Sequence, residues 1–228
     1  MPTFFDSNLN EGRVVLAVLG LNNGTAAVDG ALASSGIADP KARHNILATY
    51  AAQGIEDLYA LADRYVKQPD STVVETNDRN SIVTDVVFTC STSTLTSFLA
   101  LNGYTTYRYR YDASFPTTSL FANSGAYHTA EIFDVFGTYP LSNHFGTATI
   151  QQIDLSAFVQ KMWASFAKNP SGGVGWPRVG SALGKELGLL GSKGSSGVSV
   201  VSVVNTLVAD YPCVMYAPIG SLLKLNYK

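Results

Sequence analysis

A histidine and a glutamate, far apart in the chain, are the side chains best suited to catalysis. His128 follows the small residues Ser124-Gly125-Ala126, which allow the backbone to bend sharply, and Glu11 follows Asn10 near the start of the sequence. An imidazole accepts and returns a proton near neutral pH, and a carboxylate bound to one ring nitrogen fixes its tautomer and stabilises the imidazolium. The two residues would fit a Ser–acid–His triad, with His128 as general base and Glu11 as acid. From the residues alone, a lone histidine in a loop is more often structural or exposed, and a glutamate near a turn is usually solvated.

The nucleophile of such a triad does not occur with its usual signature. No Gly-x-Ser-x-Gly is found in the 228 residues, and Gly194-Ser195-Ser196-Gly197 has the wrong spacing. In hydrolases whose triad runs serine, acid, histidine along the chain, the serine precedes the acid. Only ten residues precede Glu11 here. We therefore expect the chain to be the later part of a longer enzyme. In isolation it is not expected to hydrolyse esters.

Several segments in a fixed order resemble the type-B carboxylesterases, the family of cholinesterases and fungal lipases. Asn10-Glu11-Gly12 resembles the turn that presents the family's acid, with Asn where Asp is more usual, and residues 125–137 resemble its histidine loop. The remaining similar segments are residues 84–90, which precede a helix in the family, residues 107–111, which form a strand, and residues 163–167 and 175–177.

This resemblance implies the fold and the activity. The fold class would be α/β, the C-terminal portion of an α/β-hydrolase fold with a mostly parallel sheet and covering helices. Residues 1–228 would form a single partial domain whose N-terminal half, with the nucleophile elbow, is missing. The activity would be that of a carboxylic-ester hydrolase acting on small-molecule or lipid esters, and the missing N-terminal half would be a partner. The parent enzyme would be secreted.

Two further features take their interpretation from the resemblance. Glu131 matches a family carboxylate that helps to hold the histidine region, although on a helix starting near Thr129 it would equally be a first-turn carboxylate favoured by the helix dipole. Cys90 and Cys213, the only cysteines, match the places of a family disulfide. By composition alone they would equally be two buried thiols.

Composition excludes several classes of function. Charged residues make up 14% of the chain and the formal net charge is −2, so there is no basic excess to hold a phosphate backbone, which argues against a nucleic acid as partner. No apolar run reaches the length of a transmembrane segment, and the first residues lack the pattern of a signal peptide. The cysteines lack the spacing of a metal site, and neither a metal nor a cofactor is expected. Asn23-Gly24-Thr25 fits a glycosylation acceptor but also a turn.

The elements that must position the pair follow from periodicity. Tyr107, Tyr109 and Tyr111 alternate with arginines, which predicts a half-buried strand with an aromatic face; single-stranded nucleic-acid binding is the alternative. Apolar residues at three- and four-residue steps predict a helix over 153–167, stopped by Asn169-Pro170. The other predicted elements are a strand over 2–8, helices from Asp39-Pro40, from about Gly54 and over 91–101, and loops at 67–79, 171–175 and 191–197.

Two questions stay open at this level. A non-catalytic binding module of the cholinesterase-like type, or an inactive pseudo-enzyme, would resemble the same family, although such proteins tend to lose triad residues and this chain keeps two. Phe133 and Phe136 would line a substrate wall or pack within a helix. His44 and His144 have no context that indicates a role.

Overall fold

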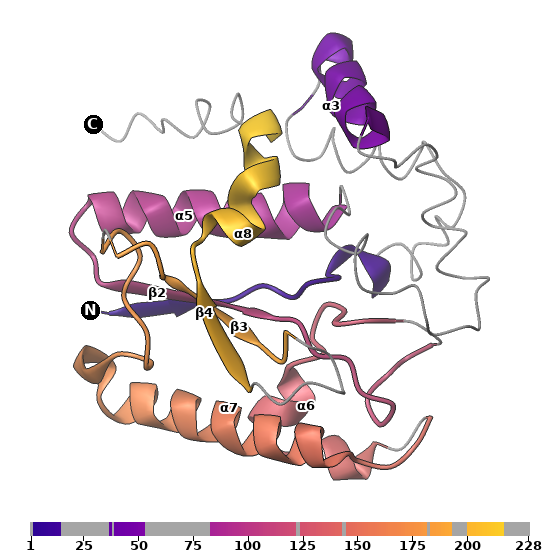
Figure 1. Ribbon diagram of the computed structural model, residues 1–228, viewed down its shortest axis with the longest axis vertical. Coiled ribbons are helices and arrows are strands. Elements are labelled where there is room, and N and C mark those ends of the chain that lie inside the picture. Colours follow the sequence, from indigo (N-terminus) through magenta and orange to yellow (C-terminus); the bar gives the residue numbers. More distant parts are fainter. Residues whose placement is uncertain are drawn as a thin grey trace.

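The computed structural model describes residues 2–14, 37, 39–52, 83–121, 124–142, 145–181, 183–192 and 200–216. Four strands form one sheet in the order β1-β2-β3-β4, and helices lie on both of its sides (Figure 1). The predicted α/β fold is therefore confirmed. The strands are β1 (Thr3–Phe5), β2 (Thr106–Tyr111), β3 (Leu187–Leu190) and β4 (Val201–Val204).

The sheet is mostly parallel, as predicted. Strand β1 runs parallel to β2, with Phe4 opposite Tyr107, and β2 runs parallel to β3; only β4 is antiparallel to its neighbour. Because parallel strands end at the same edge of a sheet, the segments that follow β1 and β2 emerge side by side. This edge is where the sequence after β1 brings Glu11 and the sequence after β2 brings His128.

Helices α5 (Cys90–Leu101) and α7 (Ile150–Lys168) lie on opposite sides of the sheet (Figure 1). The predicted ends of the helices are present. Asp39 side-chain oxygens accept hydrogen bonds from the first backbone N–H groups of α3 (Pro40–Ala52), and α5 ends before Gly103, which has a φ of 82°. The shorter helices are α6 (Ile132–Val135), α8 (Leu207–Asp210), the π-helix η1 (Thr84–Thr89), and the 3-10 helices η2 (Tyr139–Leu141), η3 (Pro170–Gly172) and η5 (Tyr211–Tyr216).

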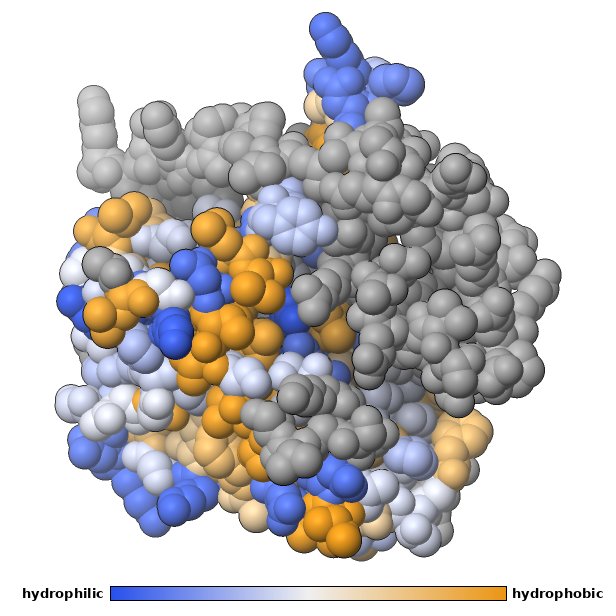
Figure 2. Space-filling view, viewed as in Figure 1, coloured by the Kyte–Doolittle hydropathy of each residue, from blue (hydrophilic) through white to orange (hydrophobic). Residues whose placement is uncertain are grey.

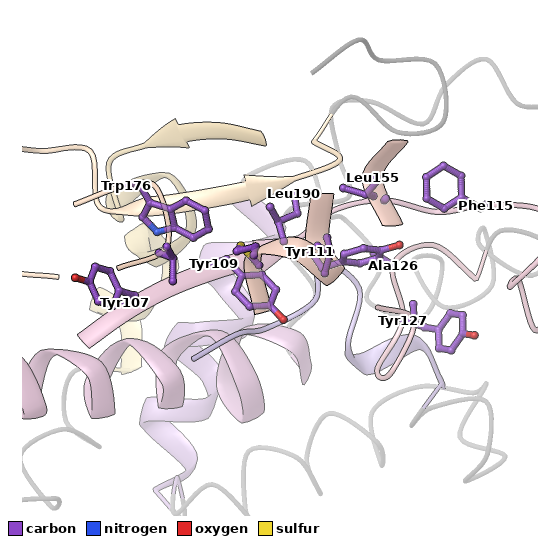
Figure 3. Packing of buried hydrophobic residues seen from close by; sticks show 14 residues of the cluster. Tyr107, Tyr109, Tyr111, Phe115, Ala126, Tyr127, Leu155, Trp176 and Leu190 are labelled. Atoms are coloured by element: carbon purple, nitrogen blue, oxygen red, sulfur yellow. The ribbon is translucent and has the colours of Figure 1, made fainter. Parts of the chain in front are cut away.

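The aromatic face of β2 forms the centre of the core. Its three tyrosines lie in a row, with Trp176 at one end and Phe115 and Tyr127 at the other (Figure 3). The apolar stripe of α7 packs against them, and its residues Leu155 and Val159 are fully buried. The periodicity of residues 153–167 therefore predicted a core helix correctly.

The opposite face of β2 corrects the sequence prediction. All six residues of the strand are buried, including Arg108 and Arg110, so β2 is not half-buried. Arg108 donates to Asp210 at 2.8 Å, and Arg110 binds Asp112 through two hydrogen bonds of 2.6 and 2.8 Å. These carboxylates compensate the loss of hydration that a buried guanidinium suffers. The enclosed arginines are unavailable to a nucleic acid.

A disulfide joins the start of α5 to η5, as the resemblance implied. The bond links Cys90 and Cys213, which are 123 residues apart. Near it, Asp210 accepts hydrogen bonds from both Ser93 of α5 and Arg108 of β2. The C-terminal part of the described chain is thus tied to α5 by a covalent link and by a partly buried polar cluster.

We expect the double variant Cys90→Ser, Cys213→Ser to be markedly less stable. Opening a loop of this length restores entropy to the unfolded chain, which in the chain-entropy model lowers the free energy of unfolding by about 4–5 kcal/mol. Urea denaturation followed by tryptophan fluorescence measures the change, with the reduced wild-type protein as a control that should match the variant. A loss below about 1 kcal/mol would contradict the entropic argument.

Some predictions concern residues outside those described: the helix from Gly54, the loop at 67–79, Asn23 and His144. His44 lies on α3 with an exposed side chain. Within the ranges described above, no helix is both long and apolar enough to cross a membrane.

Candidate active site

Glu11 is held at the carboxyl end of β1 by the continuation of strand pairing. After β1 the chain stays beside β2, because Tyr111 donates its backbone N–H to Ser7 and Leu9 donates to Tyr111. The turn that follows buries Glu11, and Oε1 of Glu11 accepts a 2.6 Å hydrogen bond from the backbone N–H of Asn8. The Glu11 carboxylate is therefore held by a hydrogen bond from within its own turn.

The loop that carries His128 is fastened to the same turn. Asn10 donates its backbone N–H to the Ala126 carbonyl, and its side-chain oxygen accepts the Ala126 N–H at 3.0 Å. Gly125 has a φ of 65°, and a Cβ there would lie 2.2 Å from that Asn10 oxygen. The sharp bend predicted before His128 thus requires glycine. Asn10, which replaces the family's more usual Asp, supplies the acceptor that the bend needs.

The structure brings Glu11 and His128 into direct contact. Nδ1 of His128 lies 2.8 Å from Oε2 of Glu11, although the residues are 117 positions apart. The Glu11 side chain is 6% exposed and that of His128 49% exposed. When Glu11 is ionised its carboxylate only accepts, so Nδ1 then carries the proton and Nε2 is the ring nitrogen that can accept one.

The electrostatic setting of Glu11 is unusual for a carboxylate. Burial raises its pKa to about 7, against the opposing effects of the Asn8 N–H and His128. The charge of nearby Glu131 contributes to this rise in pKa. The Glu11 carboxyl therefore loses its proton near neutral pH and not in the acidic range.

Glu131 lies beside Asn8, at the residue before α6. Its Oε2 accepts a 2.6 Å hydrogen bond from Asn8 Nδ2, and burial raises its pKa. Its side chain does not cap α6, a helix of only four residues. The hydrogen bond between Asn8 and Glu131 thus links the segment after His128 to the turn that holds Glu11.

Below the histidine loop lies a buried polar cluster that the sequence analysis did not identify. Asp134 of α6 accepts hydrogen bonds from the Tyr111 hydroxyl and, at 3.3 Å, from Gln152 of α7. Gln152 in turn accepts from Thr117 at 2.8 Å. Burial raises the pKa of Asp134 to about 6. An aspartate between the apolar residues Phe133 and Val135 was the signal in the sequence that could have revealed it.

The π-helix η1 supplies a further wall beside the imidazole. The ring of Phe88 lies 5.1 Å from that of His128, centroid to centroid, with an interplanar angle of 40°. At the other end of η1, Thr84 Oγ1 accepts the backbone N–H of Gly12 at 3.0 Å. Helix η1 leads directly into Cys90. Three segments that resembled the carboxylesterases, at residues 10–12, 84–90 and 125–137, thus meet at one place.

The two interpretations of Phe136, as a substrate wall or as helix packing, can be compared with the structure. Phe136 is 71% exposed, so helix packing does not account for it. Among the described residues, no group of three or more His, Cys, Asp or Glu side chains is placed to hold a metal ion.

Comparison with known proteins identifies the family. A model of the carboxylesterase family matches residues 24–194, well over half of the chain; this range contains His128 and Cys90 but not Glu11 or Cys213. Two fungal proteins are also similar. Secreted lipase 5 of Gibberella zeae is 40% identical over 95 residues, and chlorogenic acid esterase of Aspergillus niger is 33% identical over 91 residues. Each match covers 40% of this chain and 17% of the relative. The chain belongs to the carboxylesterase family.

Proposed function

We propose that this chain supplies the acid and the base of a Ser–Glu–His triad in a carboxylic-ester hydrolase, with Glu11 as the acid and His128 as the general base. The observation that carries the proposal is the 2.8 Å contact between Oε2 of Glu11 and Nδ1 of His128. Burial of the acid and exposure of half of the imidazole support these roles, because the acid needs no substrate contact and the base does.

The chemistry follows from this arrangement. With Nδ1–H donated to Glu11, Nε2 of His128 takes the proton from a serine hydroxyl as its oxygen attacks the ester carbonyl. The resulting imidazolium is stabilised by the Glu11 carboxylate, and it returns the proton to the departing alcohol. Water then attacks the acyl-serine and gives a proton to His128, which returns it to the departing serine oxygen as the carboxylic acid is released.

We place the nucleophilic serine and the oxyanion-hole donors on a segment other than these 228 residues. No Gly-x-Ser-x-Gly is present in them, and the two fungal relatives extend far beyond the matched regions. Residues 1–228 then form part of an α/β-hydrolase domain, and the isolated chain does not hydrolyse esters. The missing donors matter because oxyanion stabilisation is often the largest single contribution to catalysis.

The relatives and the disulfide support a substrate class and a compartment for the parent enzyme. The matched proteins are named as a secreted lipase and as an esterase of chlorogenic acid, which supports a carboxylic ester of a lipid or of a small molecule as substrate. The Cys90–Cys213 bond supports an oxidising, extracellular location for the parent enzyme.

A fluorophosphonate probe tests the proposal in the intact enzyme that contains this chain. The probe labels serines that are activated by a histidine, so we expect one adduct per molecule, and mass spectrometry of peptides locates it. Absence of both labelling and hydrolysis of a short-chain aryl ester would leave a binding module as the better description. An adduct on a serine within residues 1–228 would show that the nucleophile has been placed wrongly.

A further inference from the structure

Asn8 contacts Glu11, Glu131 and the residue directly before His128. Its backbone N–H donates to Oε1 of Glu11 at 2.6 Å. Its side-chain Nδ2 donates to Oε2 of Glu131 at 2.6 Å and to the Tyr127 carbonyl at 2.7 Å. Tyr127 is the residue directly before His128. One residue thus joins the triad acid, a second carboxylate and the peptide that leads into the base.

The orientation of the Asn8 amide follows from its partners. Both contacts of Nδ2 are to acceptors, and the reversed amide would place its oxygen against a carboxylate and a carbonyl. The Oδ1 atom is buried and has no hydrogen-bond partner among the described residues. Asn8 is 2% exposed and bridges Tyr111 of β2. The two short hydrogen bonds that Nδ2 donates therefore fix the orientation of the Asn8 amide, although its oxygen stays without a partner.

We propose that Asn8 is a positioning residue of the active site, which fixes Glu11, Glu131 and the peptide before His128 relative to one another through three N–H···O hydrogen bonds. This inference rests on the proposed function, because it assigns Asn8 a role in orienting the proposed base. The Asn10 contacts with Ala126 fasten the loop one residue earlier. Asn8 therefore acts on the part of the loop nearest the imidazole.

Asn8 acts on the two carboxylates through different atoms. Burial raises the pKa of Glu131 and the side-chain hydrogen bond of Asn8 lowers it, whereas the pKa of Glu11 is lowered by the backbone N–H of Asn8. Removing the side chain therefore removes a donor from Glu131 and leaves the donor to Glu11. The titratable groups whose charges or hydrogen bonds act at this place are Asp6, Glu11, Tyr109, Tyr111, Tyr127, His128, Glu131 and Asp134.

The test is a carboxylate titration of Asn8→Ala by carbon-13 NMR of the glutamate side chains. Loss of the Nδ2 donor should raise the midpoint of Glu131 by about one pH unit. The midpoint of Glu11 should stay or fall, because a protonated Glu131 no longer repels its charge. Asn102→Ala is the matched control, since the Asn102 amide donates to Phe98 at an exposed helix end; both midpoints should then match the wild type.

A second variant serves if Asn8→Ala does not fold. Asn8→Asp has the same shape, and its introduced carboxylate should raise the Glu131 midpoint further by repulsion. An unchanged Glu131 midpoint in a folded Asn8 variant overturns the proposal. Equal upward shifts of Glu131 and Glu11 overturn it too, because they would indicate a general change in packing.

Kinetics of the intact enzyme add a readout that does not depend on the titration. For a short-chain aryl ester, Asn8→Ala should lower kcat about tenfold and leave KM nearly unchanged, because a misplaced base affects the transition state more than binding. A lowered affinity with an unchanged kcat contradicts a positioning role. A protein that shows the Glu131 shift but hydrolyses no ester overturns the proposed function and leaves the contacts of Asn8 established.

Discussion

His128→Ala should lower kcat for a short-chain aryl ester by about 10⁴-fold or more in the intact enzyme, with little change in KM. Among the residues that the structure describes, the imidazole is the group in contact with Glu11 that can take a proton from serine and return it to the alcohol. Without it the hydroxyl must attack while protonated, and the leaving alkoxide departs without a proton. Initial rates with p-nitrophenyl butyrate, over a range of concentrations, separate kcat from KM.

The matched control for this variant is His44→Ala. His44 is exposed on α3, and its removal should leave turnover unchanged. Near-ultraviolet circular dichroism should show that the folded aromatic core persists in both variants, because the core tyrosines lie below the histidine loop and do not depend on the imidazole. Retention of more than a tenth of the wild-type kcat in His128→Ala would show that another group acts as the base.

The elements around the site were predictable from local patterns. The apolar stripe of α7, the capping of α3 by Asp39 and the end of α5 before Gly103 each follow from interactions within a few residues of sequence. Such interactions do not depend on the rest of the fold, so periodicity and end signals are sufficient to predict them.

The contact between Glu11 and His128 could not be predicted from local patterns. No periodicity specifies a hydrogen bond across 117 residues, and it was the resemblance to a family that placed the two side chains together. The parallel pairing of β1 with β2 is the physical cause, because it brings the ends of both strands to one edge of the sheet.

The face of β2 that carries the arginines shows why burial was underestimated. Alternating Tyr and Arg indicates one apolar and one solvated face when only the strand is considered. Arg108 is buried because Asp210, which is 102 residues away, pairs with it. Asn8 likewise gives no local signal beyond the predicted strand over 2–8, because its contacts involve two carboxylates, one of which is 123 residues distant. Local sequence patterns therefore do not reveal polar partners that are distant in the chain.

Glu11→Gln should lower the rate of catalysis and raise the stability of the fold. The introduced amide can keep the hydrogen bond from the Asn8 N–H, but its NH₂ group would face Nδ1 of His128. The imidazole then carries its proton on Nε2, which is the nitrogen that must accept the serine proton. We expect kcat to fall by about 10³- to 10⁴-fold with KM nearly unchanged.

The same substitution should raise the stability at neutral pH. The pKa of Glu11 is about 7 in the folded protein, above its ordinary value of 4.5, because burial disfavours the charge. Between these two pH values the folded state holds a proton that the unfolded state has lost, so the free energy of unfolding falls as the pH rises. Above pH 7 the loss is complete, at roughly 3 kcal/mol. Below pH 4.5 the carboxyl is protonated in both states, so its ionisation no longer affects the free energy of unfolding.

Urea denaturation at pH 4.5, 6 and 8 measures this linkage. Relative to the wild type, Glu11→Gln should gain little stability at pH 4.5 and most at pH 8, because only the wild type has a buried charge to ionise. Glu186→Gln is the matched control, since Glu186 binds Gly180 and Ser181 in a loop away from the site. A gain that is the same at all three pH values would place its origin in packing, and a loss that grows with pH would mean that the Glu11 charge stabilises the fold.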